Sequence, residues 1–185
     1  MNVRSTIRAD REQQGDAAPE SVFYDLIILG AGLSGLGAAH YFKKSFPEKT
    51  FAILDANSSY GGTWFTHRYP GVRSDSDLFN FGYKFKPWGG PPIASGAEIL
   101  RYLGDLIAED KMEPHINYGV RLLKADWSEE RKHWTLAAEE VATGLTRVFE
   151  TPFLWMCHGY YDHSRGYIPD WPGLSDFKGE VIHPQ

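Results

Sequence analysis

The segment that most limits the possible folds of this chain is the glycine-containing run GAGLSG, residues 30–35. Before it stands VFYDLIILG, residues 22–30, which has almost no polar alternation, as expected of a strand buried on both faces. A stretch with helical periodicity follows at 33–46, and Pro47 lies just beyond its end. TFAILDA, residues 50–56, predicts a second buried strand. The order strand, glycine turn, helix and strand predicts a right-handed βαβ unit within a central parallel sheet.

Each of the three glycines in this turn has a predicted role. Gly30 permits the tight turn, Gly32 lacks a Cβ so that a pyrophosphate can approach the backbone, and Gly35 lets helix and strand pack closely. The pyrophosphate would then lie at the helix N-terminus, where free N–H groups and about half a positive charge favour an anion. Ser34 would add a hydroxyl contact.

An acidic residue stands at the end of the second predicted strand. Asp55 follows Gly35 by 20 positions, the spacing at which a carboxylate reaches a ribose hydroxyl. A carboxylate there disfavours a 2′-phosphate, so the pattern predicts FAD or NAD rather than NADP at this first site. The alternative, in which GxGxxG is only a turn in a packed fold, stays open.

The remainder of the chain predicts one long loop, one helix and an antiparallel meander. Residues 57–96 are rich in Gly, Pro, Ser and aromatic residues, and only FNFGYKFKPW within them is expected to be extended. Residues 97–112 have apolar positions at helical spacing. Three runs of β-forming residues predict an antiparallel meander that ends in a buried strand: GVRLLKADWS, HWTLAAEE and TRVFETPFLWMC.

Composition excludes several classes of protein. A net charge of −5 gives no reason to expect a nucleic-acid partner, and a single cysteine, Cys157, cannot form an intrachain disulfide. Cys157 is expected to be a core residue in a reducing, cytoplasmic protein. We predict no transmembrane segment, since the longest apolar stretch is too short. Residues 1–20 are predicted to be a disordered polar tail without the features of a signal peptide. No histidine pair has metal-ligand spacing, so no metal site is predicted.

Two further motifs carry a resemblance to a known family. The stretch SSYGGTWFTHRYPGVRSDSD, residues 58–77, and the terminal pattern FxGxxxH formed by Phe177, Gly179 and His183 resemble flavin-containing and Baeyer-Villiger monooxygenases, most closely the ethionamide-activating type. The resemblance covers about residues 22–185 and implies the N-terminal portion of such an enzyme. It departs from the family at Asp55, where a glutamate is usual.

The resemblance implies a fold and a set of domains. The expected fold class is α/β, an incomplete FAD/NAD(P)-binding domain of Rossmann type with a central parallel sheet and an antiparallel meander. Residues 21–175 would be the N-terminal part of the FAD-binding domain, and residues 176–185 would begin the linker to an NADPH-binding domain outside this chain.

The resemblance also implies site residues. Arg73 and Asp75 would be catalytic. Contacts to FAD would come from Gly30, Gly32, Ser34, Gly35, Asp55, Gly62, Thr63, Trp64, Phe65, Thr66, Arg73, Ser74 and Asp75, with Leu122 near the adenine. The alternatives are a core role for Trp64 and a solvated surface pair formed by Arg73 and Asp75.

The implied activity is oxygenation of a small organic substrate by FAD, NADPH and molecular oxygen, either Baeyer-Villiger oxidation or oxygenation of sulfur or nitrogen. No second GxGxxG follows residue 35, so we expect these 185 residues alone not to turn over. The competing hypothesis is a non-catalytic nucleotide-binding module from a truncated gene. The oligomeric state is left open.

Overall fold

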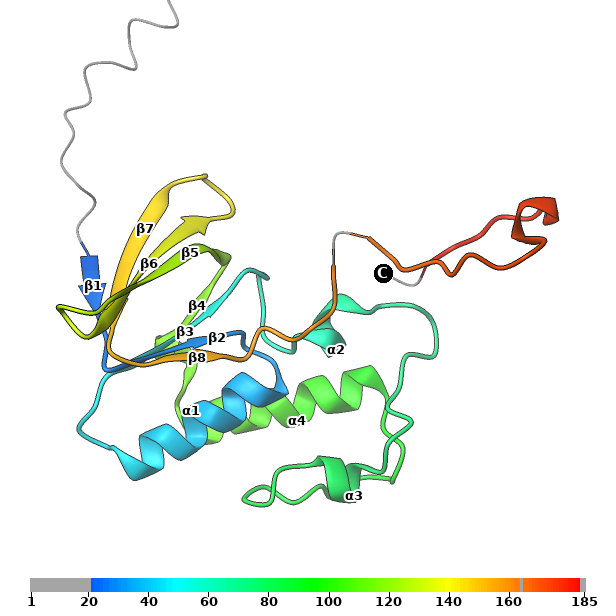
Figure 1. Cartoon of the computed structure of the whole chain (residues 1–185). Coiled ribbons are helices and arrows are strands. Elements are labelled where there is room, and N and C mark those ends of the chain that lie inside the picture. The colour runs from blue at the N-terminus through cyan, green and yellow to red at the C-terminus, as the bar shows by residue number, and fades with distance from the viewer. Residues whose placement is uncertain (1–20, 164, 184–185) are drawn as a thin grey trace, which may run out of the picture.

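A computed structural model describes residues 21–163 and 165–183; the predicted polar tail, residues 1–20, lies outside them. The described chain forms three layers, with a parallel sheet between a pair of helices and a second sheet (Figure 1). The strands of the parallel sheet, in order across it, are β4 (Ile116–Tyr118), β3 (Phe51–Asp55), β2 (Leu26–Leu29) and β8 (Leu154–Met156). This arrangement confirms the predicted α/β class and the central parallel sheet.

Two helices cover one face of the parallel sheet. They are α1 (Leu33–Ser45) and α4 (Gly96–Glu109). At the start of α4 the Ser95 side chain accepts from the N–H of Glu98, and the Glu98 carboxylate accepts from the N–H of Ser95. This reciprocal capping box satisfies two of the free N–H groups of the first turn and fixes where the helix begins.

The opposite face is covered by the meander. Its strands, in order across the sheet, are β1 (Ser21–Phe23), β7 (Thr146–Thr151), β6 (His133–Glu140) and β5 (Val120–Ser128). β5, β6 and β7 pair antiparallel, as the sequence predicts, whereas β1 joins β7 in parallel. A break in register between Leu122 and Lys124 marks a bulge in β5.

The alternation of apolar side chains along the central strands divides the core in two. Leu26 and Ile28 of β2 face the helices, and Ile27 and Leu29 face the meander. Because both sets are fully or nearly fully buried, β2 reads as a continuous apolar run. The largest side chain of the core between the two sheets is Phe149 of β7, which has no exposed surface.

Two segments that we expected to be single strands each contribute to both sheets. The run 22–30 divides after Phe23 into β1 and β2, and the run 146–157 divides at Pro152 into β7 and β8. The two segments lie side by side, because β1 pairs with β7 and β2 pairs with β8. Pro152 lacks an N–H for a sheet ladder, which suits it to the crossing point. The single-strand expectation was therefore wrong for both segments.

The long loop contains two short helices, α2 (Thr63–Thr66) and α3 (Leu78–Phe81). FNFGYKFKPW is not extended, because its first residues belong to α3; the Asp77 side chain accepts from the N–H of Phe79 and caps this helix. Two single 3₁₀ turns complete the described elements, Glu113–His115 and Leu174–Asp176. Among the described residues, none of the helices has the length and apolar character that a membrane span requires.

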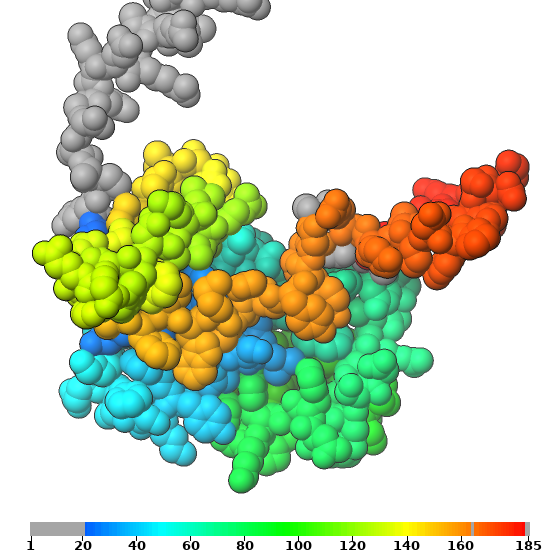
Figure 2. Space-filling view, in the orientation of Figure 1, coloured from blue at the N-terminus to red at the C-terminus, as the bar shows by residue number. Residues whose placement is uncertain are grey.

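After β8 the chain leaves the body of the molecule as an arm, which we define as residues 160–163 and 165–183 (Figures 1 and 2). The Phe177 ring lies over Gly179, where an added Cβ would come within 2.4 Å of the ring. The His183 ring lies against Gly166 in the same way, at 2.0 Å from an added Cβ. Each of the two rings of the FxGxxxH pattern therefore packs on a glycine: Phe177 on Gly179 of the pattern itself, and His183 on Gly166, which precedes it.

Candidate nucleotide-binding site

Two of the three predicted glycines are required by packing alone. A Cβ added at Gly35 would lie 1.8 Å from the carbonyl oxygen of Gly30, which no helix can accommodate. Gly30 has φ +103°, and a Cβ there would lie 2.6 Å from the carbonyl oxygen of Cys157. These contacts explain why the predicted tight turn needs a glycine at Gly30 and why the predicted close packing of helix and strand needs one at Gly35.

Gly32 is different, because the fold does not require a glycine at this position. Its φ of −83° is open to any residue, and an added Cβ would meet nothing closer than the Cα of Gly62 at 3.6 Å, an ordinary contact distance. The absence of a side chain at Gly32 therefore leaves space beside the backbone that the protein itself does not fill. Such space is what a pyrophosphate needs in order to approach the turn.

A second glycine turn meets the first one. Gly61 and Gly62 have φ of +120° and +54°, both in the region that favours glycine. The N–H of Gly61 donates to the carbonyl oxygen of Ala31 at 2.9 Å. A Cβ on Gly61 would also lie 2.3 Å from a Leu100 methyl group. Our predicted residues include Gly62 but omit Gly61, for which the doubled glycine of SSYGGTW was the available signal.

Asp55 lies at the carboxyl end of β3, where only 7% of its surface is exposed. One carboxylate oxygen accepts from the N–H of Ala31 at 2.7 Å, and the other accepts from the N–H of Asn57 at 2.8 Å. The carboxylate is thus directed at the glycine turn. A carboxylate has about four acceptor positions, so it keeps capacity for a further donor such as a ribose hydroxyl.

The first turn of α1 is open to an anion. Gly32 is the N-cap, no side chain caps the helix, and no acidic residue stands in its first turn. Its free N–H groups therefore remain available. Ser34 lies in this turn with an exposed side chain.

The four residues of α2 form a wall beside the second glycine turn. Thr63 is exposed, whereas Phe65 and Thr66 are partly buried. Trp64 is partly buried and packs on the core between the helices and the parallel sheet. The guanidinium of Arg68 lies over the Phe65 ring, 4.6 Å from its centre. The contribution of Trp64 to the core is thus visible, and its contact with a flavin stays a prediction.

The segment from Tyr69 to Asp75 begins with the predicted turn. Gly71 has φ +81°, and the N–H of Val72 donates to the carbonyl oxygen of Tyr69 at 3.2 Å, as expected of a type II turn. Ser74 is buried, and its hydroxyl donates to the carbonyl oxygen of Ser76.

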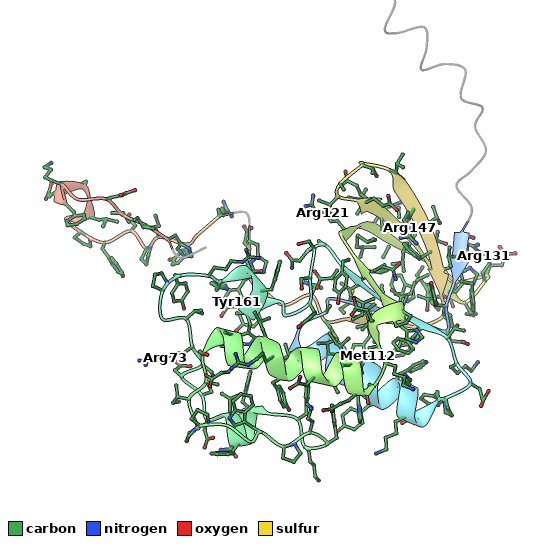
Figure 3. The ribbon with its side chains drawn as sticks, turned by 180° about the vertical axis from the view of Figure 1, so that it is seen from behind. Arg73, Met112, Arg121, Arg131, Arg147 and Tyr161 are labelled. Atoms are coloured by element: carbon green, nitrogen blue, oxygen red, sulfur yellow. The ribbon has the colours of Figure 1, made fainter. Side chains whose placement is uncertain are left out.

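Arg73 and Asp75 lie on either side of this buried serine, and both are exposed. Arg73 extends away from the body of the molecule (Figure 3). No ion pair joins the two side chains in the part of the chain that the structure describes. Their predicted catalytic roles stay predictions, and nothing in the described contacts holds them together.

Two other residues from the sequence analysis have clear positions. Leu122 of β5 is partly buried and packs on the core between the two sheets. Cys157 is half-buried where β8 ends, and its N–H donates to the carbonyl oxygen of Leu29 at 2.8 Å. Burial raises the pKa of the Cys157 thiol, which agrees with a packed residue rather than a nucleophile.

The beginning of the arm contacts the end of α2. Tyr161, labelled in Figure 3, lies with its ring centre 6.0 Å from that of His67. His67 in turn makes an edge contact with Tyr69. Within residues 21–163 and 165–183 no group of three or more His, Cys, Asp or Glu side chains is placed to hold a metal ion.

The βαβ unit, the two glycine turns and the buried Asp55 define the class as a dinucleotide-binding domain of Rossmann type. A family model described as "NAD(P)-binding Rossmann-like domain" matches residues 28–85, which include both turns.

Curated relatives narrow the class of proteins that the chain resembles. The chain is 46% identical to the putative FAD-containing monooxygenase MymA of Mycobacterium tuberculosis over 163 residues, which are 88% of this chain and 33% of that protein. It is 41% identical to the FAD-containing monooxygenase EthA of Mycolicibacterium smegmatis, with the same two coverages. The chain is therefore homologous to FAD-containing monooxygenases and spans about a third of their length.

Solved structures agree with this family. A steroid monooxygenase bound to NADP is similar with a TM-score of 0.70 and 28% identity, over 88% of this chain and 31% of that one. Cyclohexanone monooxygenase from Rhodococcus sp. Phi1, bound to NADP+, is similar with a TM-score of 0.71 and 25% identity, over 89% and 31%.

Proposed function

We propose that this chain is the FAD-binding part of a flavin-dependent monooxygenase. The observation that carries the proposal is the space beside Gly32, which lies between the two glycine turns and which packing does not explain. The names of the curated relatives, FAD-containing monooxygenases, support FAD as the dinucleotide.

The residues present fit this cofactor. The turn of Gly30, Gly32 and Gly35 with Ser34 would hold the pyrophosphate, and Asp55 would hold the adenosine ribose. Leu122 would lie near the adenine. The flavin end would lie against the segments that begin at Gly62 and end at Asp75. Bound FAD supplies the redox chemistry of the reaction, while the protein orients it and limits access of water.

The activity of the whole protein is part of the proposal. Its substrates would be NADPH, molecular oxygen and a small organic compound, consistent with the steroid and cyclohexanone monooxygenases named above. Asp75 and Arg73 would act beside the flavin as the catalytic pair. The cytoplasm is the proposed compartment, which the single Cys157 supports.

Residues 176–185 would begin the linker to the NADPH-binding domain. This position is supported by the arm, which exposes large apolar side chains away from the body of the molecule. They include Tyr167, Trp171, Phe177 and Ile182.

The decisive experiment compares FAD binding by Gly32→Ala with that of the natural chain. The added methyl group would enter the space beside the turn, so FAD affinity should fall by about tenfold or more, since roughly 1.4 kcal/mol is tenfold. The melting temperature of the FAD-free protein should fall by only a few degrees, because the methyl group meets ordinary contacts and the sole cost is that alanine is a poorer N-cap than glycine. Gly89→Ala, where an added Cβ meets nothing within 4 Å, is the matched control. Unchanged FAD affinity in Gly32→Ala would contradict the proposal.

A second experiment separates binding from turnover. We expect the chain to bind FAD but not to consume NADPH with substrate, since it has only one GxGxxG. Substrate-dependent NADPH oxidation by these 185 residues would refute that expectation.

A non-catalytic nucleotide-binding module is the second candidate. In the described part of the chain β8 pairs on one side only, with β2, and it exposes Trp155 and Met156. Such an edge favours association. A stable monomer in size-exclusion chromatography would count against this candidate.

A further inference from the structure

The Asp55 carboxylate extends the pairing of β2 and β3 beyond the strands themselves. The last bond of the ladder runs from the N–H of Gly30 to the carbonyl oxygen of Leu54 at 2.8 Å. At Gly30, with φ +103°, the chain turns away, so the next N–H, that of Ala31, has no main-chain partner in β3. The side chain of Asp55 takes its place and accepts this N–H at 2.7 Å.

Ala31 also connects the first glycine turn to the second one. Its side chain is fully buried, and its carbonyl oxygen accepts from the N–H of Gly61 at 2.9 Å. One peptide segment is therefore held from two sides, by Asp55 through its N–H and by Gly61 through its C=O. We call this series of bonds the Asp55–Ala31–Gly61 chain. Beside it, an added Cβ on Gly62 would lie 3.2 Å from the Cα of Gly32, so the two turns are in close contact.

We propose that Asp55 is a positioning residue for both glycine turns, in addition to its predicted contact with the ribose. The Asp55–Ala31–Gly61 chain fixes the distance between the turns and so the space beside Gly32 in which the pyrophosphate would lie. This inference rests on the proposed function and deepens it, because it makes phosphate binding depend on a carboxylate that touches no phosphate.

In this chain the bond from Ala31 is made by an aspartate, although a glutamate is usual at this position in the family that the sequence resembles. A glutamate would move the carboxylate by about one C–C bond, roughly 1.5 Å. The bond to Ala31 is only 2.7 Å long, and the site is 93% buried, so a longer side chain has little room to fold back. In this chain, whose turns are packed around the shorter side chain, Asp55→Glu should therefore weaken FAD binding, although its charge and its reach toward a ribose are kept.

The first test uses amide hydrogen exchange by NMR on the full chain without any ligand. Asp55→Asn removes the negative charge and turns one of the two accepting oxygens into an NH₂ donor, so the bond from Ala31 is either lost or reduced to a weaker, neutral hydrogen bond. We expect the Ala31 and Gly61 amides to exchange about tenfold faster or more, the factor that corresponds to losing one hydrogen bond to a charged group. The control is Asp25→Asn, because Asp25 accepts from the N–H of Thr50 at 2.8 Å at the other end of β3. It should leave the Ala31 and Gly61 amides unchanged relative to core amides.

The second test titrates the natural chain, Asp55→Asn and Asp55→Glu with inorganic pyrophosphate and separately with FAD. A residue that serves only the ribose would weaken FAD and leave pyrophosphate unchanged. A positioning residue weakens both, and we expect both affinities to fall by a similar factor in Asp55→Asn. Pyrophosphate binding that is unchanged in both variants would overturn the proposal.

The exchange experiment also separates this inference from the proposed function. If the natural chain binds neither FAD nor pyrophosphate, the proposed function fails, while the exchange rates still decide whether Asp55 holds the two turns. If Ala31 exchanges faster in Asp55→Asn and Gly61 does not, Asp55 holds the first turn alone and the inference is wrong.

Discussion

At each end of the strand pair β2 and β3 an aspartate side chain accepts a main-chain N–H, but the surroundings of the two aspartates differ. At the amino end Asp25 accepts from the N–H of Thr50, and at the carboxyl end Asp55 accepts from the N–H of Ala31, so each aspartate extends the ladder. The Asp25 carboxylate also accepts hydrogen bonds from the Thr50 hydroxyl at 2.9 Å and from the Lys49 ammonium at 2.8 Å. Asp55 has only main-chain donors in the described structure.

This difference shows how one side-chain type serves structure at one end and a site at the other. The Asp25 carboxylate already accepts three hydrogen bonds from its own neighbours, one of them from a cation, and is partly exposed. Asp55 is buried, keeps free acceptor capacity and makes no ion pair within the described part of the chain. A buried carboxylate without a cation favours an incoming donor more strongly than a partly exposed carboxylate that is already paired with one.

The largest effect should come from Gly35→Ala at the carboxyl end. Alanine normally stabilises a helix by about 1 kcal/mol relative to glycine. Here its Cβ would lie 1.8 Å from the carbonyl oxygen of Gly30, so we expect a loss of about 3 kcal/mol or more in the free energy of unfolding. Urea unfolding measures this change, with Gly89→Ala as the control. A Gly35→Ala protein as stable as the natural one would show that the turn is less tightly packed than described.

Asp25→Asn should have a smaller effect at the amino end. It removes the ion pair with Lys49 and weakens the bond to Thr50, for an expected loss of about 1 kcal/mol at pH 7 because the group is partly solvated. FAD affinity should stay unchanged. A fall in FAD affinity as large as that of Asp55→Asn would remove the contrast between the two ends.

The pH dependence of the free energy of unfolding should show the contribution of the ionised Asp25 carboxylate. The Lys49 ammonium, followed by the N–H of Thr50, lowers the pKa of Asp25 from its ordinary 3.8 to about 2. The unfolded chain therefore binds its proton first as the pH falls, so the contribution of Asp25 is complete above about 3.8 and is lost toward pH 2. Urea midpoints between pH 5 and pH 2 should fall less steeply in Asp25→Asn. Parallel curves for the two proteins would contradict the assignment.

The smallest effect should come from Lys49→Met. The Lys49 side chain is 57% exposed, so its pair with Asp25 should contribute only about 0.5 kcal/mol at low salt. This contribution should shrink further in 1 M NaCl, where the screening length is about 3 Å. A loss above that of Asp25→Asn would mean that Lys49 stabilises the fold by another route.

Local signals in the sequence predicted much of this structure. The βαβ unit, the amphipathic helix and the meander follow from periodicity, which depends only on nearby residues. The resemblance to flavin monooxygenases that GGTW, RYPGVRSD and FxGxxxH indicated is confirmed by the relatives, which are named FAD-containing monooxygenases. The turn at Pro70 and Gly71 followed from residue types whose backbone preferences are strong.

Features that depend on distant partners could not be predicted in this way. Nothing near Phe23 in the sequence shows that the strand passes to another sheet, because that crossing is set by β7 and β8. The bond between Asp55 and Ala31 likewise joins residues 24 positions apart. The spacing from Gly35 indicated a ribose contact but gave no sign of this second partner. The FAD contacts and the roles of Arg73 and Asp75 stay predictions.

The pairing of β2 with β8 has a consequence for how the protein is made. Ile27 of β2 lies opposite Leu154 of β8, so one edge of β2 has no partner until a residue 127 positions later has been synthesised. At roughly 5–20 residues per second, several seconds or more separate the two during translation. During that time β2 has an open edge of four fully apolar residues, an aggregation hazard for the nascent chain. The sheet that holds the nucleotide turn is thus completed late, and a ribosome that stops before Leu154 leaves it unfinished.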